Sequence, residues 1–140
     1  MDTQDYGPKP HVVDIERATT ENSNFRTTHW TGTDLQLTLM SIPPGEDIGL
    51  EVHPDNDQFL RLEQGRGRCQ MGPSEDDLSF DEEVADDWAI FVPKGTWHNV
   101  TNTGEVDMRL YAIYGPAHHP NGTIHATQEE AEEDEHDHGH

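Results

Sequence analysis

The chain has 140 residues, a length typical of one domain built around a single hydrophobic core. It carries 29 acidic residues against 8 basic ones, and its formal net charge of -21 would repel nucleic acid and anionic lipid. No apolar run approaches the roughly 20 residues of a membrane helix, and the polar N-terminus does not resemble a signal peptide. These features argue against nucleic-acid and membrane partners and, with the single cysteine Cys69, predict a cytoplasmic protein.

The acidity extends well beyond the C-terminal tail. Only two of the bases are lysines, Lys9 and Lys94, and hydrophobic residues make up 31% of the chain. Scarce lysine, abundant acid and low hydrophobicity are typical of proteins that work in concentrated salt, where screening removes the self-repulsion of the folded state. The composition therefore predicts a protein from a halophile.

The first part of the chain is expected to be extended. Residues 1–24 contain Pro8, Pro10 and a polar cluster, which predict an extended lead-in with one short strand near residues 11–15. Alternating side chains then predict a half-buried strand at residues 35–40, which Pro43-Pro44-Gly45 ends.

Short strands separated by turn signals continue from there. We expect them at residues 58–63, 66–71, 78–84, 89–92 and 107–114. Many short strands and no convincing internal helix predict an all-β fold, an antiparallel double-sheet jelly roll, over residues 25–116. Residues 117–140 form a C-terminal segment, with a short acidic helix at 127–135 capped by Thr127 and a His-rich end at 136–140 that can scavenge metal.

Two segments near the middle of the chain carry candidate metal ligands. Glu51 and His53 are two residues apart, a spacing that places both side chains on one face of a β-strand. The amide of Gln58 follows after a short turn, and the imidazole of His98 comes in a later hairpin. A carboxylate, an amide and two imidazoles form a mixed oxygen and nitrogen set that suits one divalent transition metal, namely Zn, Fe, Mn or Ni.

Turn residues around these ligands complete two spaced motifs. The first motif consists of Gly45, Glu51, His53, Gln58 and Gly65, which are separated in turn by five, one, four and six residues. The second motif consists of Pro93, Gly95, His98 and Asn102, which are separated in turn by one, two and three residues. Over residues 25–116 the pattern resembles that of the cupin superfamily, and within it the small single-domain proteins of the mannose-6-phosphate-isomerase-like type. The chain departs from that pattern at Glu51, Gln58 and Asp87, where a histidine, a glutamate and a glycine usually stand.

The resemblance implies a metal-binding cupin, and three functions stay open. The first is an isomerase or epimerase acting on a small sugar or hydroxy-carbonyl compound, because phosphomannose isomerases use a similar Gln, His, Glu and His donor set. The second is a non-haem metal dioxygenase, since Glu51, His53 and His98 alone match a two-histidine, one-carboxylate triad. The third is a non-enzymatic cupin that binds a small ligand or metal for sensing or storage.

Candidate proton-transfer residues lie near the end of the predicted barrel. Gly115-Pro116 can turn the chain so that His118 or His119 returns to the mouth of the cavity, and imidazole titrates near neutral pH. Tyr111 and Tyr114 point to opposite faces of one strand, so at most one of them lines the cavity. The candidate catalytic set is therefore His118, His119 and Tyr111.

The outward side of the sheets is expected to mediate a homodimer. Strand parity places Phe59 on that side, where so apolar a residue is unusual on an acidic surface. Pairing would bury Phe59 together with Trp30 and cover open strand edges. The same parity directs Arg61 and Arg109 away from the interior, which argues against a phosphorylated small-molecule substrate.

Overall fold

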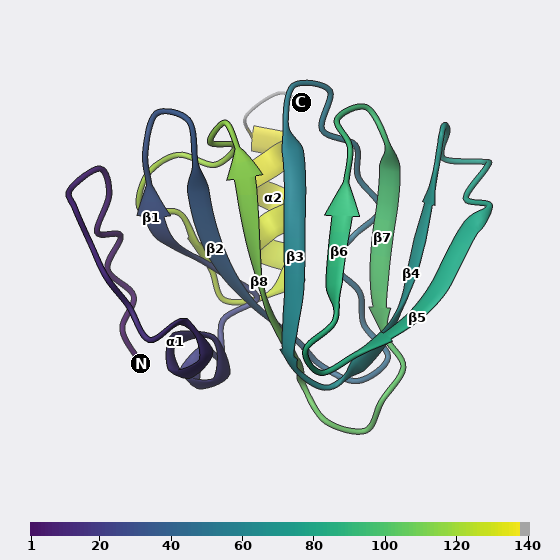
Figure 1. The fold of residues 1–140 in the computed structure, drawn as a ribbon, viewed down its shortest axis with the longest axis horizontal. Coiled ribbons are helices and arrows are strands. Elements are labelled where there is room, and N and C mark those ends of the chain that lie inside the picture. Colours follow the sequence, from purple (N-terminus) through teal and green to yellow (C-terminus); the bar gives the residue numbers. More distant parts are fainter. Residues whose placement is uncertain (138–140) are drawn as a thin grey trace.

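Nine strands in two antiparallel sheets make up the body of the structure, a computed structural model that describes residues 1–137. The larger sheet has the strand order β6-β3-β8-β2-β1-β9, and the smaller sheet has the order β5-β4-β7 (Figure 1). The strands are β1 (Arg26–Thr31), β2 (Gln36–Ile42), β3 (Asp57–Gln64), β4 (Arg66–Gly72), β5 (Phe80–Ala85), β6 (Ala89–Val92), β7 (Trp97–Asn102), β8 (Met108–Gly115) and β9 (Ile124–His125). The expected all-β, double-sheet fold is confirmed.

Strand register determines which residues line the interior. On the larger sheet Gln58 pairs with Tyr114, which pairs in turn with Gln36, and all three side chains are buried. Leu60 and Ala112, two positions along their strands, share that face because side chains alternate across a strand. The inner face of this sheet therefore carries the apolar residues Leu60 and Ala112 next to a buried polar row of Gln58, Tyr114 and Gln36.

The hydrophobic core fills the space between the two sheets. Leu62 and Leu110 from the larger sheet, with Val84 and Val100 from the smaller one, are all buried in a single cluster. Full burial of one such side chain stabilises a fold by roughly 1.5–3 kcal/mol. The core therefore fixes how far apart the two sheets stand, and with them the loops that carry the candidate ligands.

A helix occupies part of the N-terminal segment that the sequence predicted to be extended. α1 (Ile15–Glu21) begins after Asp14, whose side chain accepts a hydrogen bond from the backbone N of Arg17 at 3.1 Å. Arg17 also pairs with Glu21 one turn later, at 3.1 Å. The strand expected near residues 11–15 was therefore wrong, because the prolines that suggested extended chain precede this capped helix and do not interrupt it.

The C-terminal helix matches the expectation from sequence. In α2 (Gln128–Asp137) the Thr127 hydroxyl accepts a hydrogen bond from the backbone N of Glu130 at 3.2 Å. Ala131 belongs to the hydrophobic core, and the helix lies behind β8 and β3 in the view of Figure 1. His138 and His140 of the His-rich end lie outside the described residues. No helix within residues 1–137 is long and apolar enough to cross a membrane.

The outward side of the larger sheet carries aromatic residues. Phe59 pairs with Phe91 across β3 and β6, with ring centroids 5.1 Å apart, and Phe91 is 69% exposed. Arg61 lies on the same side and pairs with Asp87 at 3.1 Å. Arg109 donates to a backbone carbonyl of α1. Both arginines therefore point away from the interior, as strand parity indicated.

Candidate metal site

Backbone hydrogen bonds bring two loops and β7 together. Glu51 lies in an isolated bridge with His98: the Glu51 N donates to the His98 carbonyl at 3.0 Å, and the His98 N donates to the Glu51 carbonyl at 2.9 Å. The His53 carbonyl accepts from the Gly95 N at 2.8 Å, which ties this loop to the turn before β7. The spacing of Glu51 and His53 suits one face of a β-strand, and the structure has an isolated bridge at Glu51 that still directs both side chains to one place.

Three of the predicted ligands converge on one point. Glu51 Oε1 lies 3.1 Å from His53 Nε2 and 3.4 Å from His98 Nε2, and one ligand atom from each of the three residues falls within 4.8 Å of the others. Two atoms that each bind a metal at roughly 2.0–2.1 Å are about 2.9–3.4 Å apart for bond angles near 90–109°. The observed separations therefore match those of atoms that share a metal ion. We call Glu51, His53 and His98 the triad.

The surroundings of His98 leave one ring nitrogen available. Its Nδ1 lies 3.1 Å from the Thr96 carbonyl, and since a carbonyl can only accept, Nδ1 carries a proton. Its buried Nε2 makes no hydrogen bond of normal geometry among the residues that the structure describes, and Glu51 Oε1 lies 3.4 Å from it. Histidines that bind metals commonly donate their other N–H to a backbone carbonyl in this way. The arrangement therefore suits metal ligation by His98 Nε2.

Glu51 supplies the negative charge of the triad. Burial alone would raise the pKa of this carboxyl, but the imidazoles of His53 and His98 and the nearby charge of Arg26 outweigh burial and hold the pKa of Glu51 well below its usual range. The Glu51 side chain is 17% exposed, whereas the two histidines are almost fully buried. The triad thus has an ionised carboxylate on its more accessible side.

Gln58, the fourth predicted ligand, is buried on the inner face of β3. It is 4% exposed, and neither Oε1 nor Nε2 finds a hydrogen-bond partner in the described part of the chain. A buried polar group without a partner costs roughly 1–3 kcal/mol, so such groups are rare outside ligand sites. An amide oxygen is a hard, neutral donor that suits a divalent ion, and Gln58 therefore fits the predicted ligand set.

Of the predicted catalytic residues, His118 lies against the triad. Its ring centroid is 4.2 Å from that of His53, and its side chain is exposed. Tyr111 points to the outer side of the larger sheet, where its ring lies 6.1 Å from that of Phe59. The position of Tyr111 therefore gives no support to a catalytic role, and Tyr114 is the tyrosine of β8 that faces the interior.

His119 lies next to His118 and packs on Tyr114, with ring centroids 5.5 Å apart. Burial lowers the pKa of His119 to about 2, and the charges of Arg26 and His118 add to this effect. His119 is therefore held in its neutral form, which makes it a poor proton acceptor.

Sequence reasoning missed a buried arginine in the same interior. Arg26 lies on the inner face of β1, and its Nη1 is 3.2 Å from Nδ1 of His125 in β9. His125 Nε2 is in turn 2.7 Å from Asp134 Oδ2 in α2. Arg26 and His125 are 99 residues apart, and no local pattern predicts that β1 pairs with so short a strand. The sequence alone therefore carries no signal for this group.

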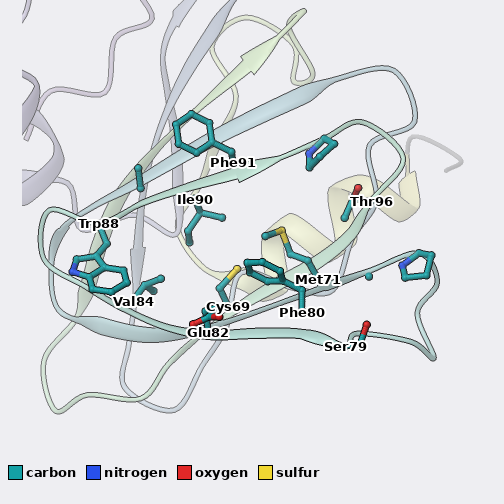
Figure 2. Close-up of a pocket in the computed structure, with 14 residues that line it drawn as sticks. Cys69, Met71, Ser79, Phe80, Glu82, Val84, Trp88, Ile90, Phe91 and Thr96 are labelled. Carbon is teal, nitrogen blue, oxygen red and sulfur yellow. The ribbon is translucent and has the colours of Figure 1, made fainter.

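A cavity of about 740 Å³ lies beside the triad and is lined by β4, β5 and β6 (Figure 2). Cys69, Met71 and Ile90 point into it, and none of the four predicted ligands lines it. Met71 is the register partner of His98, so the cavity approaches the triad at that residue. A largely apolar space of this kind is typical of small-molecule sites, and its own polar lining residues are Ser79, Glu82 and Thr96.

Comparison with known proteins agrees with this architecture. Residues 38–114, more than half of the chain, match the family model of the cupin domain. The chain is a cupin. This cupin is 60% identical over 128 residues to the uncharacterized protein YrkC of Bacillus subtilis (strain 168), covering 91% of this chain and 69% of YrkC.

Two further relatives extend the comparison. The cupin is 39% identical over 115 residues to the uncharacterized protein L612 of Acanthamoeba polyphaga mimivirus, covering 81% of this chain and 70% of L612. The crystal structure of BH2720 from Bacillus halodurans is similar with a TM-score of 0.92 at 58% identity, over 93% of this chain and 98% of that one. The names of these three relatives state no activity, so the function has to be argued from the site.

Proposed function

We propose that this cupin is a metal-dependent enzyme of the isomerase or epimerase type, acting on a small hydroxy-carbonyl compound. The observation that carries the proposal is the convergence of Glu51, His53 and His98, with the unpartnered amide of Gln58 in the same interior. Zn, Fe, Mn and Ni all accept such a mixed set. A divalent metal bound there would polarise a carbonyl group and lower the pKa of a neighbouring hydroxyl.

His118 is the residue placed to move a proton. Isomerisation or epimerisation removes a proton from a carbon beside the carbonyl and returns it to that carbon or its neighbour, so no external oxidant is needed. The His118 ring lies 4.2 Å from the His53 ring and is exposed, within reach of a molecule that contacts the triad. His119 is less suited because burial and Arg26 oppose its protonation.

A non-haem iron dioxygenase is the second candidate, and one observation favours it. Glu51, His53 and His98 by themselves form the two-histidine, one-carboxylate arrangement that such enzymes use. In that case Gln58 would contact substrate instead of metal. The two candidates differ in their need for oxygen, which provides a clean experimental distinction.

Deuterium exchange tests the proposal. Protein loaded with Mn²⁺, Zn²⁺ or Ni²⁺ would be incubated in D₂O without oxygen, with a panel of small aldoses, ketoses and hydroxy acids, and followed by NMR. We expect deuterium at the carbon beside the carbonyl, lost in His98→Ala and slowed roughly 100-fold in His118→Gln. Tyr111→Phe, on the outer side, serves as the matched control. Oxygen uptake by the Fe²⁺ form without any exchange would overturn the isomerase proposal and favour the dioxygenase.

A further inference from the structure

Arg26 is a buried charge that the proposed function leaves unexplained. The residue is 2% exposed, and its Nε has no hydrogen-bond partner among the side chains and backbone atoms that the structure describes. Its Nη1 donates to Nδ1 of His125. Arg17, Arg61, Arg68 and Arg109 each pair with a carboxylate, but no described side chain offers Arg26 a carboxylate oxygen within 4.0 Å. A buried guanidinium without such a partner is costly, so its charge calls for an explanation.

The hydrogen bonds of His125 show why it does not serve as the counter-ion. A guanidinium can only donate, so His125 Nδ1 accepts from Arg26, and its Nε2 then carries the proton that bonds to Asp134 at 2.7 Å. His125 therefore orients the guanidinium, while the carboxylate of Asp134 stays on the far side of the imidazole. The Nε–H of Arg26 is left to bond with something outside the described chain.

Arg26 and Glu51 line one cavity. This space has a volume of about 120 Å³, and α2 forms one wall of it through Gln128 and Ala131. The buried guanidinium therefore lies beside a cavity that Glu51 of the triad also lines.

Charge balance in this space favours an anionic ligand. A divalent ion on the triad and the guanidinium of Arg26 together carry three positive charges, against the single carboxylate of Glu51. Glu132 lines the same cavity but is exposed, so water and salt screen its charge. A carboxylate matches the planar donor fork of arginine, and a group of that size fits a small cavity.

We infer that Arg26 binds the carboxylate of the ligand, so that the compound held by this cupin is a small hydroxy or oxo acid. The inference rests on the proposed function in one respect, namely that the other end of the compound is bound by the metal. Inorganic phosphate is the other oxyanion that a guanidinium recognises. It is disfavoured because Arg26 is the only base whose side chain lies in this space among the described residues, whereas a phosphate dianion requires more donors.

Calorimetric titration with glycolate and with its neutral amide, glycolamide, tests the inference. Both probes, and inorganic phosphate, would be titrated into Mn²⁺-loaded and metal-free protein at one fixed ionic strength. We expect both forms to bind glycolate at least about tenfold more tightly than glycolamide, and more tightly than phosphate. Arg26→Met keeps an unbranched apolar stem at this position, removes the charge of the side chain and should abolish the preference. Arg68→Met removes an exposed charge on β4 and should leave the preference unchanged.

The outcomes separate this inference from the proposed function. Equal binding of glycolate and glycolamide by wild-type protein, no binding of either, or tighter binding of phosphate would each overturn the carboxylate assignment, whatever the metal content. The protein could prove unable to bind a metal and yet still prefer glycolate to glycolamide. That result would support the role of Arg26 and overturn the metal-dependent function. If Arg26→Met does not fold, the comparison of glycolate with glycolamide in wild-type protein decides. Arg26→Lys, which keeps the charge but loses the planar fork, provides a second test and should bind glycolate several-fold more weakly than wild-type protein does.

Discussion

Gln36 and His119 are joined by two hydrogen bonds in opposite directions. Gln36 Oε1 accepts from the backbone N of His119 at 2.8 Å, and Gln36 Nε2 donates to the His119 carbonyl at 2.7 Å. The same Oε1 accepts from the backbone N of His118 at 3.1 Å. Gln36 is fully buried on the inner face of β2, so the sheet itself holds the two histidines beside the triad.

Replacing this amide should release the segment that carries His118. We expect Gln36→Leu to lower the free energy of unfolding by roughly 2–4 kcal/mol, because two backbone N–H groups lose their acceptor. Gln64→Leu, which removes a single 2.9 Å bond to a backbone carbonyl, is the matched control and should cost about 1 kcal/mol. Urea unfolding measures both variants. Equal losses would contradict the anchoring role of Gln36.

The low pKa of His119 predicts a loss of stability in mild acid. The unfolded chain takes up a proton near pH 6.5, but the folded protein does so only near pH 2, so lowering the pH below about 6.5 favours the unfolded state. When the pH is lowered from 7.5 to 5.5, this one residue should reduce the free energy of unfolding by about 1.4 kcal/mol.

The measurement is urea unfolding of wild-type protein and of His119→Gln at both pH values. His119→Gln should lose about 1.4 kcal/mol less than wild type over this interval, since its side chain does not titrate. His11→Gln removes an exposed histidine of the N-terminal segment and serves as the control. If His119→Gln and wild type lost the same amount, the account of His119 as a buried neutral group would be wrong.

The charge of -21 predicts that stability rises with salt. Repulsion among acidic groups is screened as ionic strength increases, so we expect the melting temperature to rise by at least about 4 °C from dilute buffer to molar potassium chloride. A variant with Asp76, Glu83 and Glu105, all exposed, changed to the amides should show a smaller rise. A melting temperature that does not change with salt would count against the halophile interpretation.

The exposed aromatic residues of the outer face predict a homodimer. Phe91 is 69% exposed and contacts Phe59, so pairing of two larger sheets would bury both rings. Light scattering should give the mass of a dimer, more strongly populated as salt screens the like charges of the subunits. Phe91→Asp should give a monomer, and Phe80→Asp, which changes an exposed aromatic on β5, should not. A monomer for the wild-type protein at every salt concentration would contradict this assembly.

Local spacing predicted much of the fold and most of the triad. Glu51 and His53 belong to one short segment, and His98 follows a marked turn, so their positions follow from alternation and turn residues. Asp87 illustrates the same point: it stands where a glycine is usual, and its φ of 71° lies in the left-handed region that favours glycine. The turn could therefore be located from the motif even though its usual residue is missing.

Contacts between distant segments could not be predicted in this way. Arg26 meets His125 because β1 pairs with β9, and His125 meets Asp134 because α2 folds back over the interior. Each of these relations depends on packing among segments far apart in the chain, which leaves no periodic pattern in the sequence. The capped helix at residues 15–21 was missed for a different reason, since its signals are local but weaker than those of the neighbouring prolines.

Elemental analysis shows directly whether the triad binds a metal. The protein would be purified without an affinity tag and without added metal, and the metal content per chain measured. We predict one divalent transition metal per chain in wild-type protein and in a variant with His136, His138 and His140 changed to glutamine. The double variant His53→Ala with His98→Ala should remain folded and retain none. Stoichiometric metal in that folded double variant would contradict the account.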